Sequence, residues 1–206
     1  MIIKPENQSV KDIHKLMIGS IVPRPIALVS TISKDNVNNL APFSYFSGVC
    51  SNPPTIVFAP GRRGWDGEKK DTLINIESKK EFVVNVVSES FADKMVSCST
   101  DFESEIDEFS ISKLTPGKSK IVKPPLVLES KINLECKLNQ IIEIGNGEIG
   151  SGFLVIGTIV LFHIDDSVYE EGRINLDKLM PIGRLAGNSY SKQLNRFEIK
   201  RKIKPG

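Results

Sequence analysis

The stretch VNNLAPFSYFSGVCSNPP, residues 37–54, decides how the chain is interpreted. Its valine and aromatic residues are typical of strands, yet Pro42 lies in the middle and Pro53–Pro54 ends it. Proline donates no hydrogen bond to a neighbouring strand, so within sheets it is confined to edge strands and bulges. Two interpretations are open. Either Pro42 protects an edge strand, or it interrupts the strand so that unpaired backbone groups face a ligand.

Short β-branched runs separated by turn residues dominate the rest of the chain. Strands are predicted at 26–33, 55–60, 81–87, 131–144 and 152–164. Their spacing, with turns that contain Asn, Gly and Pro, favours an antiparallel barrel or sandwich. The sequence therefore predicts a mainly β fold with small peripheral helices, in a single domain over residues 1–206.

Helical patterns are sparse. The stretch 71–80 begins with Asp71 as its expected cap and has an apolar side made of Leu73, Ile74 and Ile76. The stretch 88–99 begins with Ser88 or Ser90 as its expected cap and has an apolar side made of Phe91, Met95 and Val96. The acidic run DFESEIDEF, residues 101–109, is interpreted as a solvated loop or helix, with an acidic partner-binding patch as the alternative.

Composition excludes several classes of protein. The 206 residues include 27 basic and 25 acidic ones, which leaves a formal net charge of +2. This balance argues against a general nucleic-acid or membrane-surface binder. The N-terminus MIIKPENQSV lacks the apolar core of a signal peptide, and no window has the length of a membrane span, so a cytoplasmic protein is expected. Cys50, Cys98 and Cys136 are far apart in sequence and are expected to be buried, reduced thiols.

No catalytic residue and no metal ligand is assigned from the sequence. GNGEIG, residues 145–150, matches the dinucleotide fingerprint G-x-G-x-x-G, but a strand pattern follows it where a helix is required, so we interpret it as a hairpin turn. His14 and His163 are the only histidines, and His163 is expected to pair with Asp165 or Asp166 in a structural role. Any chemistry would then come from a cofactor.

Three segments could build a cofactor site. Arg24 lies between two prolines, which suits either a guanidinium held for an anionic partner or a solvated side chain at a barrel rim. Residues 38–44 mix small, polar and apolar groups in an extended backbone, as a planar ring would require. Residues 61–76 place Arg62, Arg63, Lys69 and Lys70 before a helix that includes Thr72, which predicts a phosphate site or a basic surface loop.

Taken in order, PRPIALVST, NLAPFSYFSGVCSNPP, KKDTLINI and EFVVNVV resemble the flavin reductase-like, FMN-binding split-barrel family. The resemblance continues through DEFSISKL (107–114), VKPPLVLES (122–130), LEC (134–136) and IGRLAGNSY (182–190), and so covers roughly residues 15–190. Within the family the chain looks most like flavoredoxin-type or uncharacterised bacterial and archaeal members. The resemblance implies a six-stranded Greek-key split β-barrel that forms a homodimer and binds FMN near the dimer interface.

The resemblance also implies which residues contact FMN. Those expected along the isoalloxazine ring are Asn39, Leu40, Ala41 and Pro42, with Ser44 toward the ribityl chain or the phosphate. Those expected on the phosphate side are Lys70, Asp71, Thr72 and Asn75, with Arg62 close by. The remaining matches are Arg24, Ser30 and Thr31 near the first strand, and Gly187 and Tyr190 in a C-terminal loop over the ring. Ala186 stands where the family usually has a glycine, which puts substrate access to the ring in question.

The implied reaction is hydride transfer from NADH or NADPH to FMN, followed by electron transfer to a small-molecule acceptor or a redox partner protein. Hydride transfer itself needs no general acid or base, in agreement with the lack of a catalytic constellation. No nucleic-acid or membrane partner is expected. Two alternatives stay open: an FMN-binding electron carrier without NAD(P)H turnover, and a β-barrel module without flavin that binds a phosphate-bearing or nucleic-acid ligand.

Overall fold

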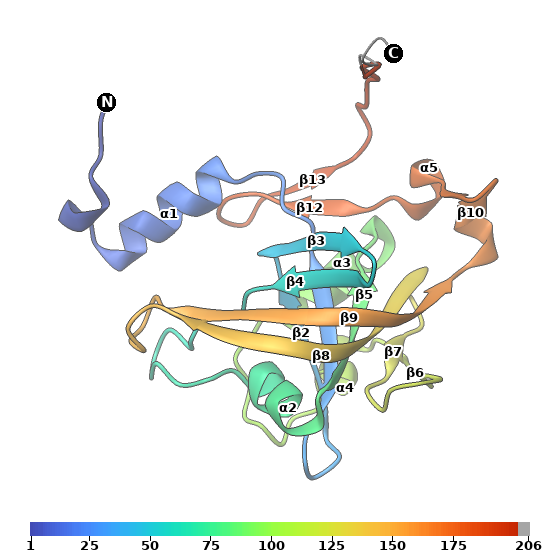
Figure 1. Cartoon of the computed structure of the whole chain (residues 1–206), viewed down its shortest axis with the longest axis horizontal. Coiled ribbons are helices and arrows are strands. Elements are labelled where there is room, and N and C mark those ends of the chain that lie inside the picture. The colour runs from blue at the N-terminus through green and yellow to red at the C-terminus, as the bar shows by residue number, and fades with distance from the viewer. Residues whose placement is uncertain (202–206) are drawn as a thin grey trace.

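The computed structural model describes residues 1–201, and a seven-stranded antiparallel sheet forms its centre (Figure 1). The strands are β1 (Ala27–Ile32), β2 (Asn38–Phe43), β3 (Phe46–Ser51), β4 (Pro54–Phe58), β5 (Glu81–Val86), β8 (Ile132–Ile144) and β9 (Gly152–Ile164). They pair in the order β2-β1-β5-β8-β9-β4-β3, so β2 and β3 are the two edges. The predicted mainly β fold is confirmed. There are seven strands where six were expected, because residues 37–54 form two strands, separated at Ser44 and Tyr45.

Pro42 lies inside β2 and not at an interruption of it. Its partner in the register with β1 is Leu28. Two residues earlier, the N–H of Leu40 donates to Glu108 and not to β1. Because backbone groups alternate in direction along an antiparallel strand, position 42 faces outward like position 40. A proline there loses no ladder hydrogen bond, so the edge-strand interpretation is correct and the interrupted strand is wrong.

Two clusters of buried side chains form the core. Inside the curved sheet, Phe58 packs against Phe43 and Phe82, with ring centroids 5.2 and 5.5 Å apart. On the other face of β1 and β2, Leu28 and Leu40 belong to a second cluster, which is covered by α3 (Ala92–Ser97) and α4 (Glu108–Ser112). β1 is thus buried on both faces, its polar residues Ser30 and Thr31 included.

The GNGEIG segment is a turn, as predicted. It joins β8 and β9, which pair antiparallel over their whole length. Gly145, Gly147 and Gly150 have φ of 101°, 86° and 97°, values that side-chain-bearing residues rarely adopt. Short strand pairs and further helices surround the sheet. They are β6 (Pro116–Gly117) with β7 (Leu126–Val127), β10 (Tyr169–Glu170) with β11 (Arg173–Ile174), β12 (Ile182–Arg184) with β13 (Tyr190–Lys192), and the helices α1 (Val10–Ser20) and α5 (Leu176–Leu179).

The first predicted helix is present as α2 (Asp71–Lys79), with two differences in detail. Its N-cap is Lys70, and Asp71 is the first helical residue, so the expected cap was wrong. Ile74 is 45% exposed, because the buried stripe of α2 consists of Thr72, Leu73, Asn75 and Ile76. Thr72 and Asn75 are polar, so the spacing of apolar residues alone could not assign them to the buried side.

The second predicted helix is shorter than expected, and α1 was not predicted. Residues 89–91 form a 3-10 turn before α3, Ser88 makes no side-chain cap bond within the described residues, and Val96 is 42% exposed. The expectation of a solvated acidic run fails at Glu108, which is buried. No helix within residues 1–201 is long and apolar enough to cross a bilayer.

Two further expectations need correction. Cys98 and Cys136 are buried as predicted, but Cys50 is exposed because it lies on the edge strand β3. His163 bonds to Glu135, with its Nε2 2.5 Å from Oε1, and not to Asp165 or Asp166. His163 pairs with Asn133 in the β8–β9 register, so Glu135 is its diagonal neighbour on the same face of the sheet.

Candidate functional site

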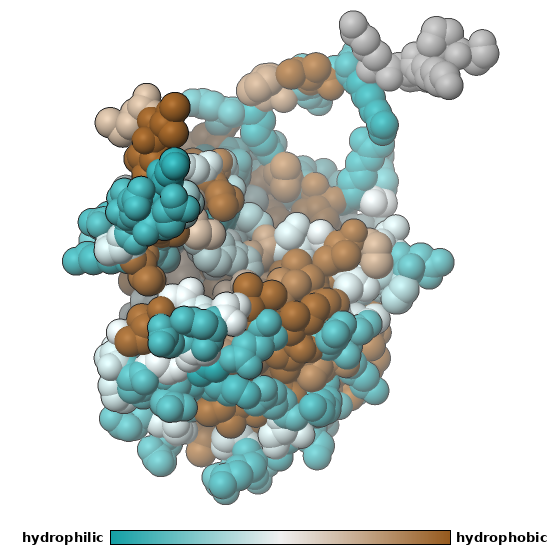
Figure 2. Space-filling model, turned by 60° about the vertical axis from the view of Figure 1, so that its left-hand side comes forward, coloured by the Kyte–Doolittle hydropathy of each residue, from teal (hydrophilic) through white to brown (hydrophobic). Residues whose placement is uncertain are grey.

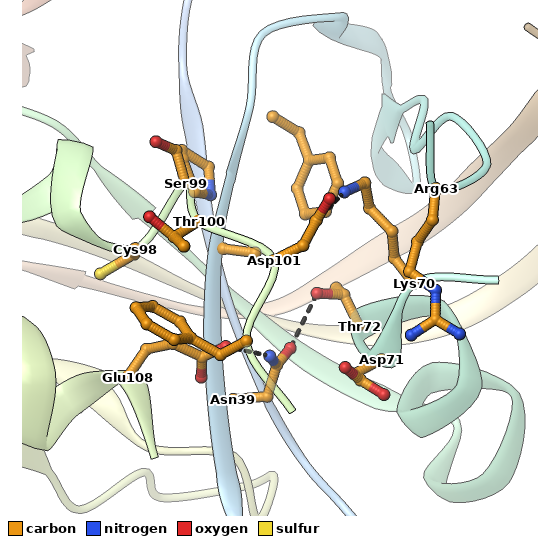
Figure 3. Close-up of a pocket in the computed structure, with 14 residues that line it drawn as sticks. Asn39, Arg63, Lys70, Asp71, Thr72, Cys98, Ser99, Thr100, Asp101 and Glu108 are labelled. Atoms are coloured by element: carbon orange, nitrogen blue, oxygen red, sulfur yellow. Dashed lines mark hydrogen bonds and ion pairs between the residues drawn. The ribbon is translucent and has the colours of Figure 1, made fainter. Parts of the chain in front are cut away.

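One pocket brings together much of the chemistry that the sequence singled out (Figure 3). It encloses about 520 Å³, including space open to solvent, and lies between β2, the start of α2 and the segment that joins α3 to α4. Its lining residues are Asn39, Ala41, Pro42, Phe43, Arg63, Lys70, Asp71, Thr72, Cys98, Ser99, Thr100, Asp101, Phe102 and Glu108. One wall is therefore the apolar surface of an edge strand, and another is the N-terminus of a helix.

The helix end of the pocket combines two basic side chains with the N-terminus of α2. The N-terminus of α2 presents backbone N–H groups that no preceding turn can bind, together with the positive end of the helix dipole. Lys70 and Arg63 add two side-chain charges beside it. Arg63 binds Asp66 through Nη2 at 3.1 Å, but within residues 1–201 its buried Nε has no hydrogen-bond partner. An anion of the size of a phosphate fits this chemistry.

Two acidic residues from different directions reach the same end. Lys70 Nζ lies 2.6 Å from Asp101 Oδ1, and Ser104 Oγ donates to Asp71 Oδ1 at 2.7 Å. Both contacts tie the segment after α3 to the first turn of α2. Asp71, which had been expected to cap the helix, instead accepts a hydrogen bond from a serine hydroxyl.

A buried hydrogen-bond network underlies the pocket floor. Asn39 Oδ1 accepts from Thr72 Oγ1 at 2.8 Å and from Thr31 Oγ1 at 3.1 Å. Asn75 Nδ2 donates to Thr31 Oγ1 at 3.0 Å. On the other side, Asn39 Nδ2 donates to Glu108 Oε1 at 2.9 Å, as Figure 3 shows. The network thus joins β1, β2, α2 and α4 through side chains that are all buried.

Two titratable groups of the pocket have shifted pKa values. Burial raises the pKa of Glu108 above its usual range, although its bonds from Leu40 and Asn39 oppose the shift. Burial also raises the pKa of the Cys98 thiol to about 11, and the neighbouring charge of Glu108 adds to this effect. Cys98 therefore stays protonated near neutral pH and is a poor nucleophile.

The structure divides the predicted site residues into groups. Six line the pocket: Asn39, Ala41, Pro42, Lys70, Asp71 and Thr72. Thr31 and Asn75 lie behind them in the buried network. Ser30 and Leu40 lie on the opposite face of the two strands, where Ser30 Oγ donates to the carbonyl of Pro125 and Leu40 packs in the second core cluster.

The remaining predicted residues lie outside this pocket's lining. Arg24 is buried and donates to Ser44 Oγ (3.1 Å) and to the carbonyls of Ile18 (2.9 Å), Ile21 (2.6 Å) and Leu185 (3.0 Å). This side chain thereby connects the C-terminal end of α1, the β2–β3 junction and the residue after β12. Gly187, at φ 56°, follows in the same loop, and Tyr190 stacks on Arg184 with 4.5 Å between the guanidinium carbon and the ring centroid. Arg62 binds Glu143 and the carbonyl of Gly67.

Several lining residues were missed at the sequence level. They are Cys98, Ser99, Thr100, Asp101, Phe102 and Glu108, most of which belong to one segment, whereas Phe43 and Arg63 had been named within the candidate segments 38–44 and 61–76. A signal was present, since Asn38–Asn39 pairs with Asp107–Glu108: Asn38 Nδ2 donates to Asp107 Oδ2 at 3.1 Å, beside the Asn39–Glu108 bond. Complementary dipeptides so far apart in sequence become informative only when the two segments are known to meet.

Comparison with known proteins gives consistent results. The family described as "Flavin reductase like domain" matches residues 18–181. Nitrilotriacetate monooxygenase component B from Bacillus cereus is 40% identical, with a TM-score of 0.92 over 97% of this chain and 98% of that one. The 2-nitrobenzoate 2-nitroreductase NbaA of Pseudomonas fluorescens is 31% identical, with a TM-score of 0.88 over 98% and 96%. The flavoredoxin of Desulfovibrio vulgaris (Miyazaki F) shares the fold at 22% identity, with a TM-score of 0.73 over 97% of both chains.

Proposed function

The chain belongs to the flavin reductase-like domain family, and on that premise we propose that it binds FMN in the pocket between β2, α2 and residues 98–102. We further propose that it is an oxidoreductase, which takes electrons from NADH or NADPH and passes them to a flavin, another small molecule or a redox partner protein. The structurally similar proteins named for monooxygenase component B and nitroreductase activity support an oxidoreductase role.

The residues present fit FMN. The helix N-terminus, Lys70 and the Nε of Arg63, which has no partner within residues 1–201, suit a phosphate, which carries most of the cofactor's charge. Ala41, Pro42 and Phe43 supply an apolar wall for one side of a flat ring. The single observation that carries the proposal is this combination of a cationic helix end with a flat apolar strand in one pocket.

The side chains of this protein would bind and orient, and need not react. Lys70 would hold the phosphate by a charge-assisted hydrogen bond, and Thr72 would stay bonded to Asn39 behind it. Ser99 and Thr100 would cover the cofactor from the segment after α3 and limit the access of water. Bound FMN would supply the hydride-accepting chemistry, so no side chain of the pocket would need to react with the substrate.

We also propose that the protein is a homodimer. None of the eleven residues of α1 is buried, and Leu16, Met17 and Ile21 are 41%, 43% and 51% exposed. The edge strand β3 exposes five of its six residues, including Val49. Hydrophobic residues gather around a hollow on the face shown in Figure 2. Association with a second copy would remove these apolar side chains from water, which favours a dimer. The cytoplasmic location stays a prediction.

An absorbance spectrum and an anaerobic titration test the proposal. The purified protein should quench the fluorescence of added FMN at a one-to-one ratio, and NADH or NADPH should then bleach the visible absorbance of the oxidised flavin. FMN binding without bleaching by either nucleotide would favour the electron carrier. No quenching would exclude FMN as the cofactor and leave the module without flavin.

A further inference from the structure

Glu108 is the most constrained acidic group of the pocket, although it lies in a run whose other charges are largely exposed. Glu108 is the first residue of α4 and is 6% exposed. Oε2 accepts the backbone N–H of Leu40 at 2.9 Å, and Oε1 accepts Nδ2 of Asn39 at 2.9 Å. Both oxygens thus face N–H donors, and the ionised carboxylate can accept a hydrogen bond on each of them.

The contact with Leu40 removes the one backbone donor at the middle of the outer edge of β2. Position 42, the next outward-facing position, is a proline and has no N–H group. At positions 40 and 42 the strand consequently presents carbonyl oxygens on this edge and no free N–H group. Glu108 and Pro42 together prevent the edge from pairing with another strand and leave it available to a ligand.

The contact with Asn39 fixes which groups of the buried network donate hydrogen bonds and which accept them. Because Nδ2 must face the Glu108 carboxylate, the amide oxygen of Asn39 must face the hydroxyls of Thr31 and Thr72. Each hydroxyl has a single proton, so Thr72 donates its proton to Asn39 and offers only its lone pairs elsewhere. The donors left for an anion at this end are then the backbone N–H groups of α2 and the charges of Lys70 and Arg63.

We infer that Glu108 is a positioning residue of the cofactor site, which acts through Asn39 and Leu40 to fix the donor and acceptor pattern that the pocket presents to FMN. This inference rests on the proposed function. A buried carboxylate in the pocket wall also adds negative charge beside the cofactor, and so disfavours the more anionic, reduced form of a bound flavin.

Exchanging the carboxylate of Glu108 and the amide of Asn39 between the two positions tests the inference. In Glu108→Gln the introduced amide nitrogen faces the donor of Asn39, and in Asn39→Asp two carboxylates face each other. In the double variant Glu108→Gln/Asn39→Asp every bond can form again. The glutamine side chain would accept from Leu40 and donate to the introduced aspartate, whose other oxygen would accept from both threonines. Asp107→Asn is the matched control, since it removes a charge one residue away, outside the pocket lining, and keeps a cap-forming side chain.

FMN dissociation constants and the midpoint potential of bound FMN are the readouts, with chemical unfolding of the cofactor-free proteins to register folding. We expect each single variant to weaken FMN binding at least about tenfold, which is the typical effect of one lost charge-assisted bond. Glu108→Gln should also raise the potential. The double variant should return both quantities close to those of the wild type, and Asp107→Asn should leave them unchanged.

The possible failures are distinguishable. If the wild-type protein does not bind FMN, the proposed function is wrong, whatever the variants do. If the wild type binds FMN but Glu108→Gln binds it equally well, or the double variant binds no better than the worse single one, the positioning role is wrong. If a single variant does not fold, recovery of both folding and FMN affinity in the double variant supports the inference, whereas recovery of folding alone overturns it.

Discussion

Lys70 and Asp101 form an ion pair at the helix end of the pocket, with 2.6 Å between Nζ and Oδ1. The partners come from the N-cap of α2 and from the segment between α3 and α4. The carboxylate therefore lies where Lys70 would otherwise contact an anionic ligand. The bond between Ser104 and Asp71 holds the same segment in place from its other side. The segment and a bound phosphate would compete for one lysine.

Removal of the charge at position 101 should therefore strengthen phosphate binding. In Asp101→Asn the ion pair is lost, and we expect FMN to bind several-fold more tightly, since an exposed pair of this kind is worth up to about 1 kcal/mol. Riboflavin, which lacks the phosphate, should bind as it does to the wild type. Fluorescence titrations with both ligands measure the difference. The exposed Glu103→Gln is the control. An equal change for FMN and riboflavin would contradict the competition.

Adjacent lysines should differ sharply in their importance. Lys70 lines the pocket, whereas Lys69 binds Glu77 and lies 5.4 Å from the ring centroid of Phe153. Lys70→Gln should weaken FMN binding about tenfold to a hundredfold, the usual range for a hydrogen bond to a charged group. Lys69→Gln should leave it within about twofold of the wild type. Dissociation constants at two salt concentrations provide the measurement, and a larger effect at position 69 would refute the placement of the phosphate.

The two lysines also show how much of the fold and of the site could be predicted from the sequence. Five strand runs and α2 were predicted because their apolar residues repeat at short range, and the basic cluster before α2 marked the anion end. Nothing local separates Lys69 from Lys70, or Glu108 from the acidic residues around it. Their difference arises from contacts across the fold, such as Asn39 with Glu108, which lie 69 positions apart. For the same reason the residues alone left Pro42 as either an edge or a ligand-facing residue, and the interrupted strand that the resemblance favoured is contradicted by the continuous β2.

The close packing of Gly157 against Phe82 makes the core sensitive to a single methyl group. A Cβ at Gly157 would lie 2.3 Å from Cζ of Phe82, whose ring is fully buried. Gly157→Ala should therefore lower the free energy of unfolding by about 1–3 kcal/mol, the usual cost of overpacking. Gly48→Ala is the control, because nothing lies within 4 Å of its Cβ position in the exposed strand β3. Chemical denaturation of both variants checks this, and equal stability would show that Phe82 can move aside.

The stability of the protein should depend on pH through Glu135, whose side chain is fully buried. Glu135 accepts backbone N–H groups from Lys120 (2.7 Å), Ile121 (2.6 Å) and Val122 (2.8 Å), as well as the contact from His163. Burial opposes its ionisation, but these donors prevail and lower the pKa of Glu135 to about 2. Since the unfolded chain has a glutamate pKa of about 4.3, the ionised group stabilises the fold above that value, by about 3 kcal/mol.

This stabilisation must disappear as the pH falls from about 4 toward 2, because the folded protein then has to take up the proton it had excluded. Glu135→Gln should lower the free energy of unfolding by about 2–3 kcal/mol at pH 7, and the difference from the wild type should shrink steadily on acidification. Glu143→Gln removes the same charge from a half-exposed carboxylate that pairs with Arg62, so it should cost less than about 1 kcal/mol. Denaturant titrations between pH 7 and pH 3 measure both. A Glu135→Gln deficit that stays constant over this range would mean that the carboxylate contributes through packing and not through its charge.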